Sequence, residues 1–217
     1  MAQPLTDCLL EARSVEPAAQ ALRKMPIRVA DLRRAAPDVM VLRMQLPSNQ
    51  EFPYRAGQYV DLILRDGARR SYSMATAPQR LGSPPMIELH LRHMPGGQFT
   101  DHVFASLKER DVLRMEGPLG SFHLREDSRR PIVLLASGTG FAPIRAILQR
   151  MQDLGDDRPA MLYWGGRRSA DLYLHDWAVQ AELAMPGLRY VPVLSEPVPD
   201  DGWTGRTGFV HRAVMED

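Results

Sequence analysis

Residues 131–147, PIVLLASGTGFAPIRAI, constrain the fold of this 217-residue chain more than any other stretch. Residues 132–136 form a short run of mostly branched apolar residues, which is typical of a strand buried on both faces of a parallel sheet. Gly138-Thr139-Gly140 follows, and a helical pattern begins at Pro143, a residue suited to the first turn of a helix. Strand, glycine turn and helix N-terminus together indicate an anion site that suits a dinucleotide pyrophosphate. The spacing is not G-x-G-x-x-G, which leaves a buried strand with an ordinary tight turn as the alternative.

Composition and charge exclude several classes of protein. The formal net charge of +1 gives no electrostatic case for nucleic acid or an anionic membrane as partner. No apolar run approaches the roughly 20 residues that cross a bilayer, and the N-terminus lacks the pattern of a signal peptide, so we expect a cytoplasmic protein. The single cysteine, Cys8, excludes an internal disulfide and a multi-cysteine metal site, and we predict no metal site in this chain.

The first half of the chain has the pattern of short strands joined by turns. A turn is predicted at Asp66-Gly67, and a helix is predicted over 99–109. The predicted strands are 27–30, 39–46, 57–64, 69–74, 86–92 and a strand with a turn over 111–120. Several short strands at this spacing favour an antiparallel barrel.

After Arg130 the pattern changes to strands that alternate with helices. The predicted strands are 131–136, 160–164 and 188–194, and the predicted helices are 143–153, 170–183 and one that begins at 208. Such alternation predicts a parallel sheet, and the charged residues 126–130 suit the boundary between two domains. The predicted fold class is therefore a two-domain α+β and α/β chain, an antiparallel β-barrel followed by a parallel-sheet nucleotide-binding domain.

Two polar clusters in the first half suit a phosphate-bearing cofactor. In Arg70-Ser71-Tyr72-Ser73, the arginine can fork onto a pyrophosphate, the tyrosine can stack on a heterocycle, and a hydroxyl can bond a ring nitrogen. Gly97-Gln98-Phe99-Thr100 opens the helix predicted over 99–109 and offers a second anion cradle. The alternatives are a polar strand with a core tyrosine and an ordinary helix cap.

Four motifs in this order resemble the ferredoxin–NADP⁺ reductase superfamily, whose flavin domain is of the FAD-binding FR type. The motifs are Arg-x-Tyr-Ser, Gly-Gly-x-x-Thr, Gly-Pro-x-Gly-x-Phe and Gly-Thr-Gly-x-Ala-Pro, and they extend over nearly the whole chain. The runs AGQYVDL, RSYSMA and LLASGTGFAPI resemble the subgroup of oxygenase reductase components and CDP-6-deoxy-3,4-glucoseen reductase. The resemblance implies an FAD-binding barrel over 25–127 and a partial NAD(P)-binding domain over 128–217.

The resemblance also implies roles for individual residues. Tyr72 would lie against the isoalloxazine ring and Ser73 would reach toward its N5, which makes these two the catalytic candidates. The other residues expected to bind FAD are Arg70, Ser71, His90, Leu91, Arg92, Gly97, Gln98 and Thr100. Those expected to bind the nicotinamide dinucleotide are Gly138, Thr139, Gly140, Pro143, Gly166, Arg167 and Ser195. Asp171 is expected to be structural.

Glu196 follows Ser195 and would repel a 2′-phosphate, which favours NADH over NADPH, although Arg167 and Arg168 argue the other way. The resemblance implies that a hydride passes from NAD(P)H to FAD, and single electrons then pass to an iron–sulfur centre or a partner such as an oxygenase or dehydrase component. The alternative is a non-catalytic flavin- or nucleotide-binding, redox-regulatory module.

The two ends of the chain depart from the family pattern. Residues 1–24 resemble a linker remnant, because AQPLTD is similar to the tail of a plant-type [2Fe–2S] ferredoxin domain. We expect the cluster domain itself to be absent, since one cysteine cannot hold such a cluster. The family continues past the point where this chain stops, at Asp217, so we expect a nucleotide domain truncated at its C-terminus. FAD binding should tolerate that truncation better than hydride transfer does.

Overall fold

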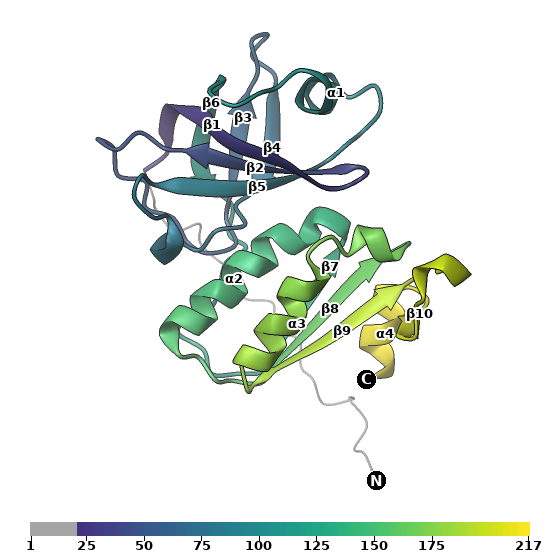
Figure 1. Cartoon of the computed structure of the whole chain (residues 1–217). Coiled ribbons are helices and arrows are strands. Elements are labelled where there is room, and N and C mark those ends of the chain that lie inside the picture. The colour runs from purple at the N-terminus through teal and green to yellow at the C-terminus, as the bar shows by residue number, and fades with distance from the viewer. Residues whose placement is uncertain (1–20) are drawn as a thin grey trace.

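The computed structural model describes residues 21–217. Residues 1–20, which include Cys8 and most of the predicted linker, lie outside the described residues. The described part forms two sheets, and each sheet carries its own helices (Figure 1). Within residues 21–217 no helix is long and apolar enough to cross a bilayer.

The first sheet has six antiparallel strands in the order β4-β3-β6-β1-β2-β5. They are β1 (Arg23–Ala36), β2 (Val39–Gln45), β3 (Tyr59–Ile63), β4 (Arg69–Ser73), β5 (Met86–Arg92) and β6 (Val112–Leu119). The predicted turn at Asp66-Gly67 joins β3 to β4: Gly67 has φ +85°, and the Ala68 amide donates to Asp66 Oδ1 at 2.9 Å. The antiparallel first domain is confirmed.

The sheet curls without closing into a complete barrel. Its two edge strands, β4 and β5, meet through a single isolated bridge between Met74 and Leu89. The Ala75 amide also donates to the Glu88 carbonyl at 2.8 Å. The first domain is therefore barrel-like, as predicted, and its sheet does not close into a complete barrel.

Helix α1 (Gln98–Ala105) covers one side of this sheet and buries Phe99 and Val103. It is shorter than the helix predicted over 99–109. The amides of Ser106 and Leu107 both donate to the His102 carbonyl, and Arg110 takes φ +73°. The helix ends where its C-cap, Ser106, leaves the helical region at φ −144°, and the chain then turns toward β6 through Arg110.

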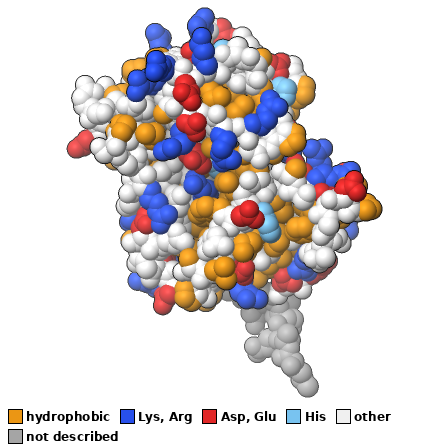
Figure 2. All heavy atoms as spheres, in the orientation of Figure 1, with side chains coloured by type: hydrophobic (Ala, Val, Ile, Leu, Met, Phe, Trp, Pro, Cys, Tyr) orange, Lys and Arg blue, Asp and Glu red, His pale blue; other side chains and the backbone are white. Residues whose placement is uncertain are grey.

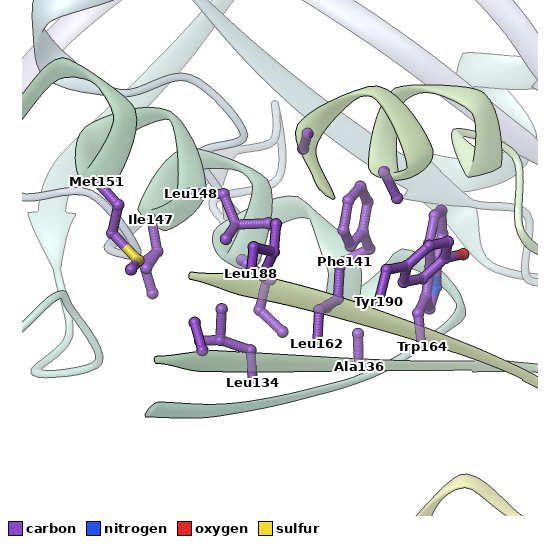
Figure 3. Packing of buried hydrophobic residues seen from close by; sticks show 14 of the residues in the cluster. Leu134, Ala136, Phe141, Ile147, Leu148, Met151, Leu162, Trp164, Leu188 and Tyr190 are labelled. Atoms are coloured by element: carbon purple, nitrogen blue, oxygen red, sulfur yellow. The ribbon is translucent and has the colours of Figure 1, made fainter. Parts of the chain in front are cut away.

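The second sheet is parallel, as predicted, and its strand order is β10-β9-β8-β7. Its strands are β7 (Ile132–Ser137), β8 (Ala160–Gly166), β9 (Leu188–Leu194) and the two-residue β10 (Arg206–Thr207). Helices α2 (Phe141–Leu154) and α3 (His175–Ala184) pack on one face, where their apolar residues meet Leu134, Leu162 and Leu188 (Figure 3). Helix α4 (Val210–Glu216) packs on the other face.

Two expectations for this domain are wrong. Strand β7 is an edge strand with alternating burial, and Val133 and Leu135 are 59% and 49% exposed, so it is not buried on both faces. No described element covers these two side chains. The helix predicted over 170–183 begins only at His175, because Ser169–Asp171 form a separate 3₁₀ turn, η4.

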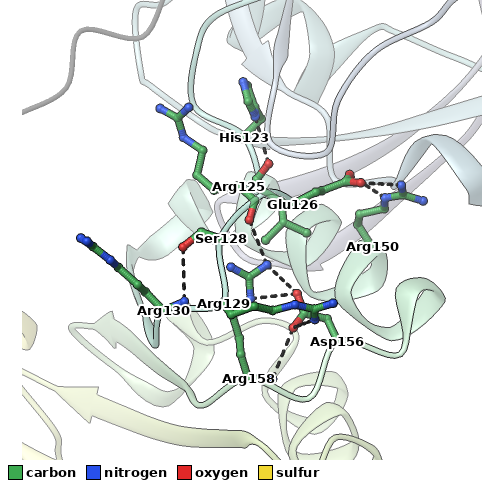
Figure 4. A network of polar contacts seen from close by, with 10 residues as sticks. His123, Arg125, Glu126, Ser128, Arg129, Arg130, Arg150, Asp156 and Arg158 are labelled. Atoms are coloured by element: carbon green, nitrogen blue, oxygen red, sulfur yellow. Dashed lines mark hydrogen bonds and ion pairs between the residues drawn. The ribbon is translucent and has the colours of Figure 1, made fainter.

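The segment between the two sheets is tied to the second domain (Figure 4). Glu126 accepts two hydrogen bonds from Arg150 of α2 at 2.8 Å each. Arg158 donates to the Arg125 carbonyl at 3.0 Å and forms a buried ion pair with Asp156. The charges that suggested a linker therefore anchor this segment, while the exact domain boundary stays a prediction.

Candidate cofactor site

Strand β4 carries the predicted flavin-binding residues, and its pleat divides them between two sides. Successive side chains of a strand point to opposite faces, so Arg70 and Tyr72 share one side and Ser71 and Ser73 the other. Tyr72 lies 5.9 Å from Phe99 of α1, between ring centroids. Burial raises the pKa of Tyr72 to about 12, so its hydroxyl stays protonated at neutral pH.

The remaining polar groups of β4 have different partners. Arg70 is exposed, and its guanidinium donates to the Arg69 carbonyl at 2.8 Å. The Ser71 hydroxyl donates to Asp61 Oδ1 at 2.6 Å, so it is engaged away from the side that holds Tyr72. Ser73 ends the strand and is half-buried.

The start of α1 is a tight turn that leaves no room for a side chain at Gly97. A Cβ there would lie 2.6 Å from Thr100 Oγ1 and 2.7 Å from the Met94 carbonyl oxygen. Thr100 Oγ1 lies 3.0 Å from that same carbonyl and accepts from the Met94 amide at 3.2 Å. Thr100 therefore stabilises the turn itself.

A cavity of about 620 Å³ opens beside α1, between the end of β3 and the start of β6. Gln98 and Phe99 line it, together with Arg65 and Arg114. The predicted cradle thus adjoins a hollow with both apolar and cationic walls.

At the end of β5, His90 and Arg92 each have one polar contact with the second domain, whereas Leu91 is fully buried in the first. Arg92 donates to Asp38 Oδ2 at 2.7 Å and to Asp171 Oδ1 at 2.5 Å. A Cβ on Gly138 would lie 3.0 Å from Arg92 Nη1, which means that this guanidinium touches the glycine turn. The two predicted half-sites meet at this point.

The glycine turn after β7 is a 3₁₀ turn, η3 (Gly138–Gly140), that leads directly into α2. Gly138 takes φ +50°, and its carbonyl accepts from Trp164 Nε1 at 3.0 Å. Phe141 stacks on Trp164 with centroids 3.9 Å apart. Pro143 is the third residue of α2, which confirms its predicted place in the first turn. Gly140 is exposed, and a Cβ added to it would meet open space.

The strands next to β7 end at the same edge of the sheet as Gly138, with Gly166 of β8 paired to Leu194 of β9. Arg167 follows the first of these residues and Ser195 follows the second. The Ser195 amide donates to the Gly166 carbonyl at 2.9 Å. Asp171 Oδ2 accepts from the Arg167 and Arg168 amides at 2.7 and 3.1 Å. Burial raises the pKa of Asp171, but these amides and Arg92 outweigh it and hold the pKa below its usual range. Asp171 is an anchor for this loop.

Sequence reasoning missed a buried polar network between the domains. Glu88 Oε1 lies 2.9 Å from His90 Nε2 and 2.9 Å from Arg145 Nη1, and His90 Nδ1 lies 2.7 Å from the Tyr173 hydroxyl. An ionised carboxylate only accepts, so His90 donates through Nε2 and Tyr173 donates to Nδ1. The signal was present in MIELHLR, where Glu88, His90 and Arg92 share one face of the strand.

Among residues 21–217 no group of three or more His, Cys, Asp or Glu side chains is placed to hold a metal ion. The predicted site residues instead offer guanidinium and backbone donors in both domains, on either side of the contact that Arg92 makes between them. Such a site suits two phosphate-bearing molecules that meet between the domains.

Comparison with known proteins gives matches to both halves of the chain. A family model described as "Oxidoreductase FAD-binding domain" matches residues 26–124, and one described as "Oxidoreductase NAD-binding domain" matches residues 134–217. The CDP-6-deoxy-L-threo-D-glycero-4-hexulose-3-dehydrase reductase of Yersinia pseudotuberculosis is 42% identical over 195 residues, which are 88% of this chain and 56% of that protein.

Two further relatives have the same extent. Reductase component 1 of the terephthalate 1,2-dioxygenase of Comamonas sp. is 38% identical over 86% of this chain and 55% of its own length. The crystal structure of the Amycolatopsis cytochrome P450 reductase GcoB has a TM-score of 0.80 and 36% identity, over 90% of this chain and 58% of that one. The chain thus spans a little over half the length of these relatives.

Proposed function

Because the chain belongs to the ferredoxin–NADP⁺ reductase superfamily, whose members join an FAD-binding to an NAD-binding domain, we propose that it is an NAD(P)H-dependent flavoprotein reductase. The observation that carries the proposal is the contact of Arg92, from the first domain, with the turn at Gly138 in the second. This contact brings the end of β5, with its predicted flavin-binding residues, against the predicted nicotinamide turn.

The residues of the first domain fit FAD. Arg70 has only the Arg69 carbonyl as a hydrogen-bond partner within residues 21–217, so guanidinium donors remain for a pyrophosphate. Gly97 permits the tight turn that presents the first backbone amides of α1, which would hold a phosphate. Tyr72 presents a half-buried ring and a protonated hydroxyl, as a residue against a flat heterocycle requires. Ser71, Ser73, Gln98 and Thr100 complete the proposed FAD set.

The second domain fits a nicotinamide dinucleotide. The first amides of α2 and the turn at Gly138–Gly140 would bind its pyrophosphate. Gly166, Arg167 and Ser195 lie along the same sheet edge and would face a ribose. Glu196 is exposed beside Ser195, so we propose NADH as the preferred donor over NADPH.

Bound FAD supplies the chemistry of taking two electrons as hydride from a reduced nicotinamide and releasing them singly. The chain's own residues would bind and orient it: Arg70 and the turn at Gly97 would hold its phosphates, Tyr72 would pack against its ring, and Arg92 would keep the glycine turn close to the end of β5. No side-chain base is needed.

We further propose that the electrons leave to an iron–sulfur centre on another domain or on a partner protein. The relatives' names, a dehydrase reductase and a dioxygenase reductase component, support such an acceptor. We propose a cytoplasmic location and domains that divide near residue 127.

The test is an anaerobic visible spectrum of the purified chain, recorded before and after NADH and, separately, NADPH. A flavin spectrum that NADH bleaches faster than NADPH supports the proposal. A flavin spectrum that neither donor changes would favour the alternative, a non-catalytic flavin-binding module. Absence of a flavin spectrum after reconstitution with FAD would contradict the proposed role of Arg70 and Tyr72 in FAD binding.

A further inference from the structure

A second cavity, of about 310 Å³, lies between the two domains at the opposite end of β5 from Arg92. No residue predicted to bind FAD or the nicotinamide lines it. Its polar lining consists of Arg43, Thr76, Arg80, Glu88, Arg145 and Gln149. The face of the molecule where the two domains meet carries several basic side chains (Figure 2).

Three guanidinium groups and one carboxylate line this cavity. The single carboxylate, Glu88, already accepts from His90 and Arg145. Arg80 is paired with Asp153 at 2.8 Å. Arg43 is exposed and forms no hydrogen bond or ion pair with any residue of the described chain, and it lies opposite Glu88 in the ladder between β2 and β5.

Side-chain oxygens that line the cavity already accept hydrogen bonds from the protein, whereas hydrogen-bond donors on the same side chains have no partner among the described residues. Gln149 Oε1 accepts from the Ala77 amide at 2.9 Å, which leaves its amide hydrogens. Thr76 Oγ1 accepts from the Glu88 amide at 2.9 Å, which leaves its hydroxyl hydrogen. Arg145 Nε is buried and has no partner among residues 21–217. Buried donors in proteins are almost always satisfied, so this nitrogen is an exception among the described residues, and it is closed off from the open cavity.

We propose that this cavity binds a phosphate group, either as inorganic phosphate or on a small phosphomonoester. A tetrahedral oxyanion accepts hydrogen bonds from several directions and suits guanidinium donors that converge from different elements. Arg43 and Thr76 come from the first domain, and Arg145 and Gln149 come from α2. The bound anion therefore ties the two domains together at a site distinct from both cofactor sites.

The test is a calorimetric titration of the purified chain with inorganic phosphate at constant ionic strength, with and without saturating NAD⁺. We expect one site that persists in NAD⁺, and an affinity at least about tenfold weaker in Arg43→Gln, as for a lost charge-assisted hydrogen bond. Arg189→Gln, which removes an exposed arginine from β9, is the matched control and keeps the wild-type affinity.

Equal affinity in Arg43→Gln and the wild type overturns the proposal, as does the absence of binding. Loss of phosphate binding in saturating NAD⁺ also overturns it, because the phosphate then occupies the nicotinamide site. Glycerol 3-phosphate, titrated in the same way, separates the two sources: if it binds in an Arg43-dependent manner the ligand is a phosphomonoester, and if only inorganic phosphate does so the ligand is the free ion. The titration does not depend on flavin, so it stands apart from the spectral test.

Discussion

Gly97 and Gly140 are both glycines at the start of a helix, yet the space around them differs. A Cβ at Gly97 meets the Met94 carbonyl oxygen at 2.7 Å, whereas a Cβ at Gly140 meets no other atom within 4 Å. The motif that contains each glycine is visible in the sequence, but the clearance around it is not, because it depends on where Met94 and Thr100 lie.

We predict that Gly97→Ala lowers the free energy of unfolding by about 1–3 kcal/mol, since a backbone atom has to move, and reduces the flavin-to-protein absorbance ratio. Gly140→Ala is the matched control, and its unfolding free energy should change by less than about 0.5 kcal/mol. Urea unfolding and the visible spectrum measure both. Equal effects of the two substitutions would contradict the packing argument.

His90 is buried with both ring nitrogens bonded. Burial is the largest influence on its pKa and lowers it, and the opposing effect of Glu88 is smaller. The unfolded chain therefore binds a proton at His90 near pH 6.5 where the folded chain does not. The stabilising contribution of neutral His90 is present above that pH and is lost as the pH falls below it.

We predict that the unfolding free energy of the wild type falls between pH 7 and pH 5.5, with His90 contributing at most about 1.4 kcal/mol per pH unit. His90→Gln should be less stable at pH 7 and should have a shallower slope. Urea unfolding at four pH values gives both quantities, with the exposed His211→Gln as control. An unchanged slope in His90→Gln would contradict the assignment of the slope to His90.

At the scale of elements, β8 holds the turn that precedes α2. Trp164 is fully buried, stacks on Phe141 at the start of α2, and donates its Nε1 hydrogen to the Gly138 carbonyl. A side chain of one strand thus shapes the glycine turn of the neighbouring strand. The register of β7 on β8, in which Ala136 pairs with Trp164, brings the two together.

We predict that Trp164→Phe costs about 1–3 kcal/mol of stability through a lost hydrogen bond and a cavity, and raises the KM for NADH more than it lowers flavin content. Trp177→Phe is the control, because Trp177 packs on the same cluster without a hydrogen bond to the turn. Steady-state kinetics with NADH and the flavin absorbance separate the two effects. A Trp164→Phe enzyme with unchanged KM would show that the turn does not need this support.

At the scale of the whole molecule, the domains meet through charged groups in different surroundings. The Glu88 and Arg145 side chains are 18% and 16% exposed and join β5 to α2, whereas Glu126, which pairs with Arg150, is 47% exposed. Burial lowers the pKa of Arg145, and Glu88 only partly offsets this. Removing Glu88 leaves a buried guanidinium without its counter-charge.

We predict that Glu88→Gln destabilises the chain by about 3–5 kcal/mol, as expected when one partner of a buried pair is removed. Glu126→Gln breaks a pair near the surface whose separation is 2.8 Å, against 2.9 Å for Glu88 and Arg145, and should cost less than about 1 kcal/mol. Thermal unfolding of the two variants in parallel compares them. A similar loss of stability in both variants would mean that water reaches the Glu88–Arg145 pair, so that its burial adds nothing to the cost.

The fold and the candidate site were predictable from the sequence where a feature depends on residues that are adjacent in the chain. Pro143 in the first turn of α2, the turn at Asp66-Gly67 and the parallel order of the second sheet all follow from local pattern, because turn and helix-start chemistry is written in adjacent residues. Ends of helices were harder to place. Helix α1 stops at Ala105 because the chain has to return to β6, which is a tertiary requirement.

The two-domain order, the glycine turns and the family follow from the sequence, because they depend on residue types at short, fixed spacings. Which polar side chains of the strands face the contact between the domains depends on the folded structure. It placed Glu88, His90 and Arg92 against Arg145, Tyr173 and Asp171, residues some 57 to 83 positions apart in contact pairs. It also left Val133 and Leu135 exposed and opened a cationic cavity at Arg145. Such contacts arise from the packing of one domain on the other, and no short stretch of sequence records that geometry.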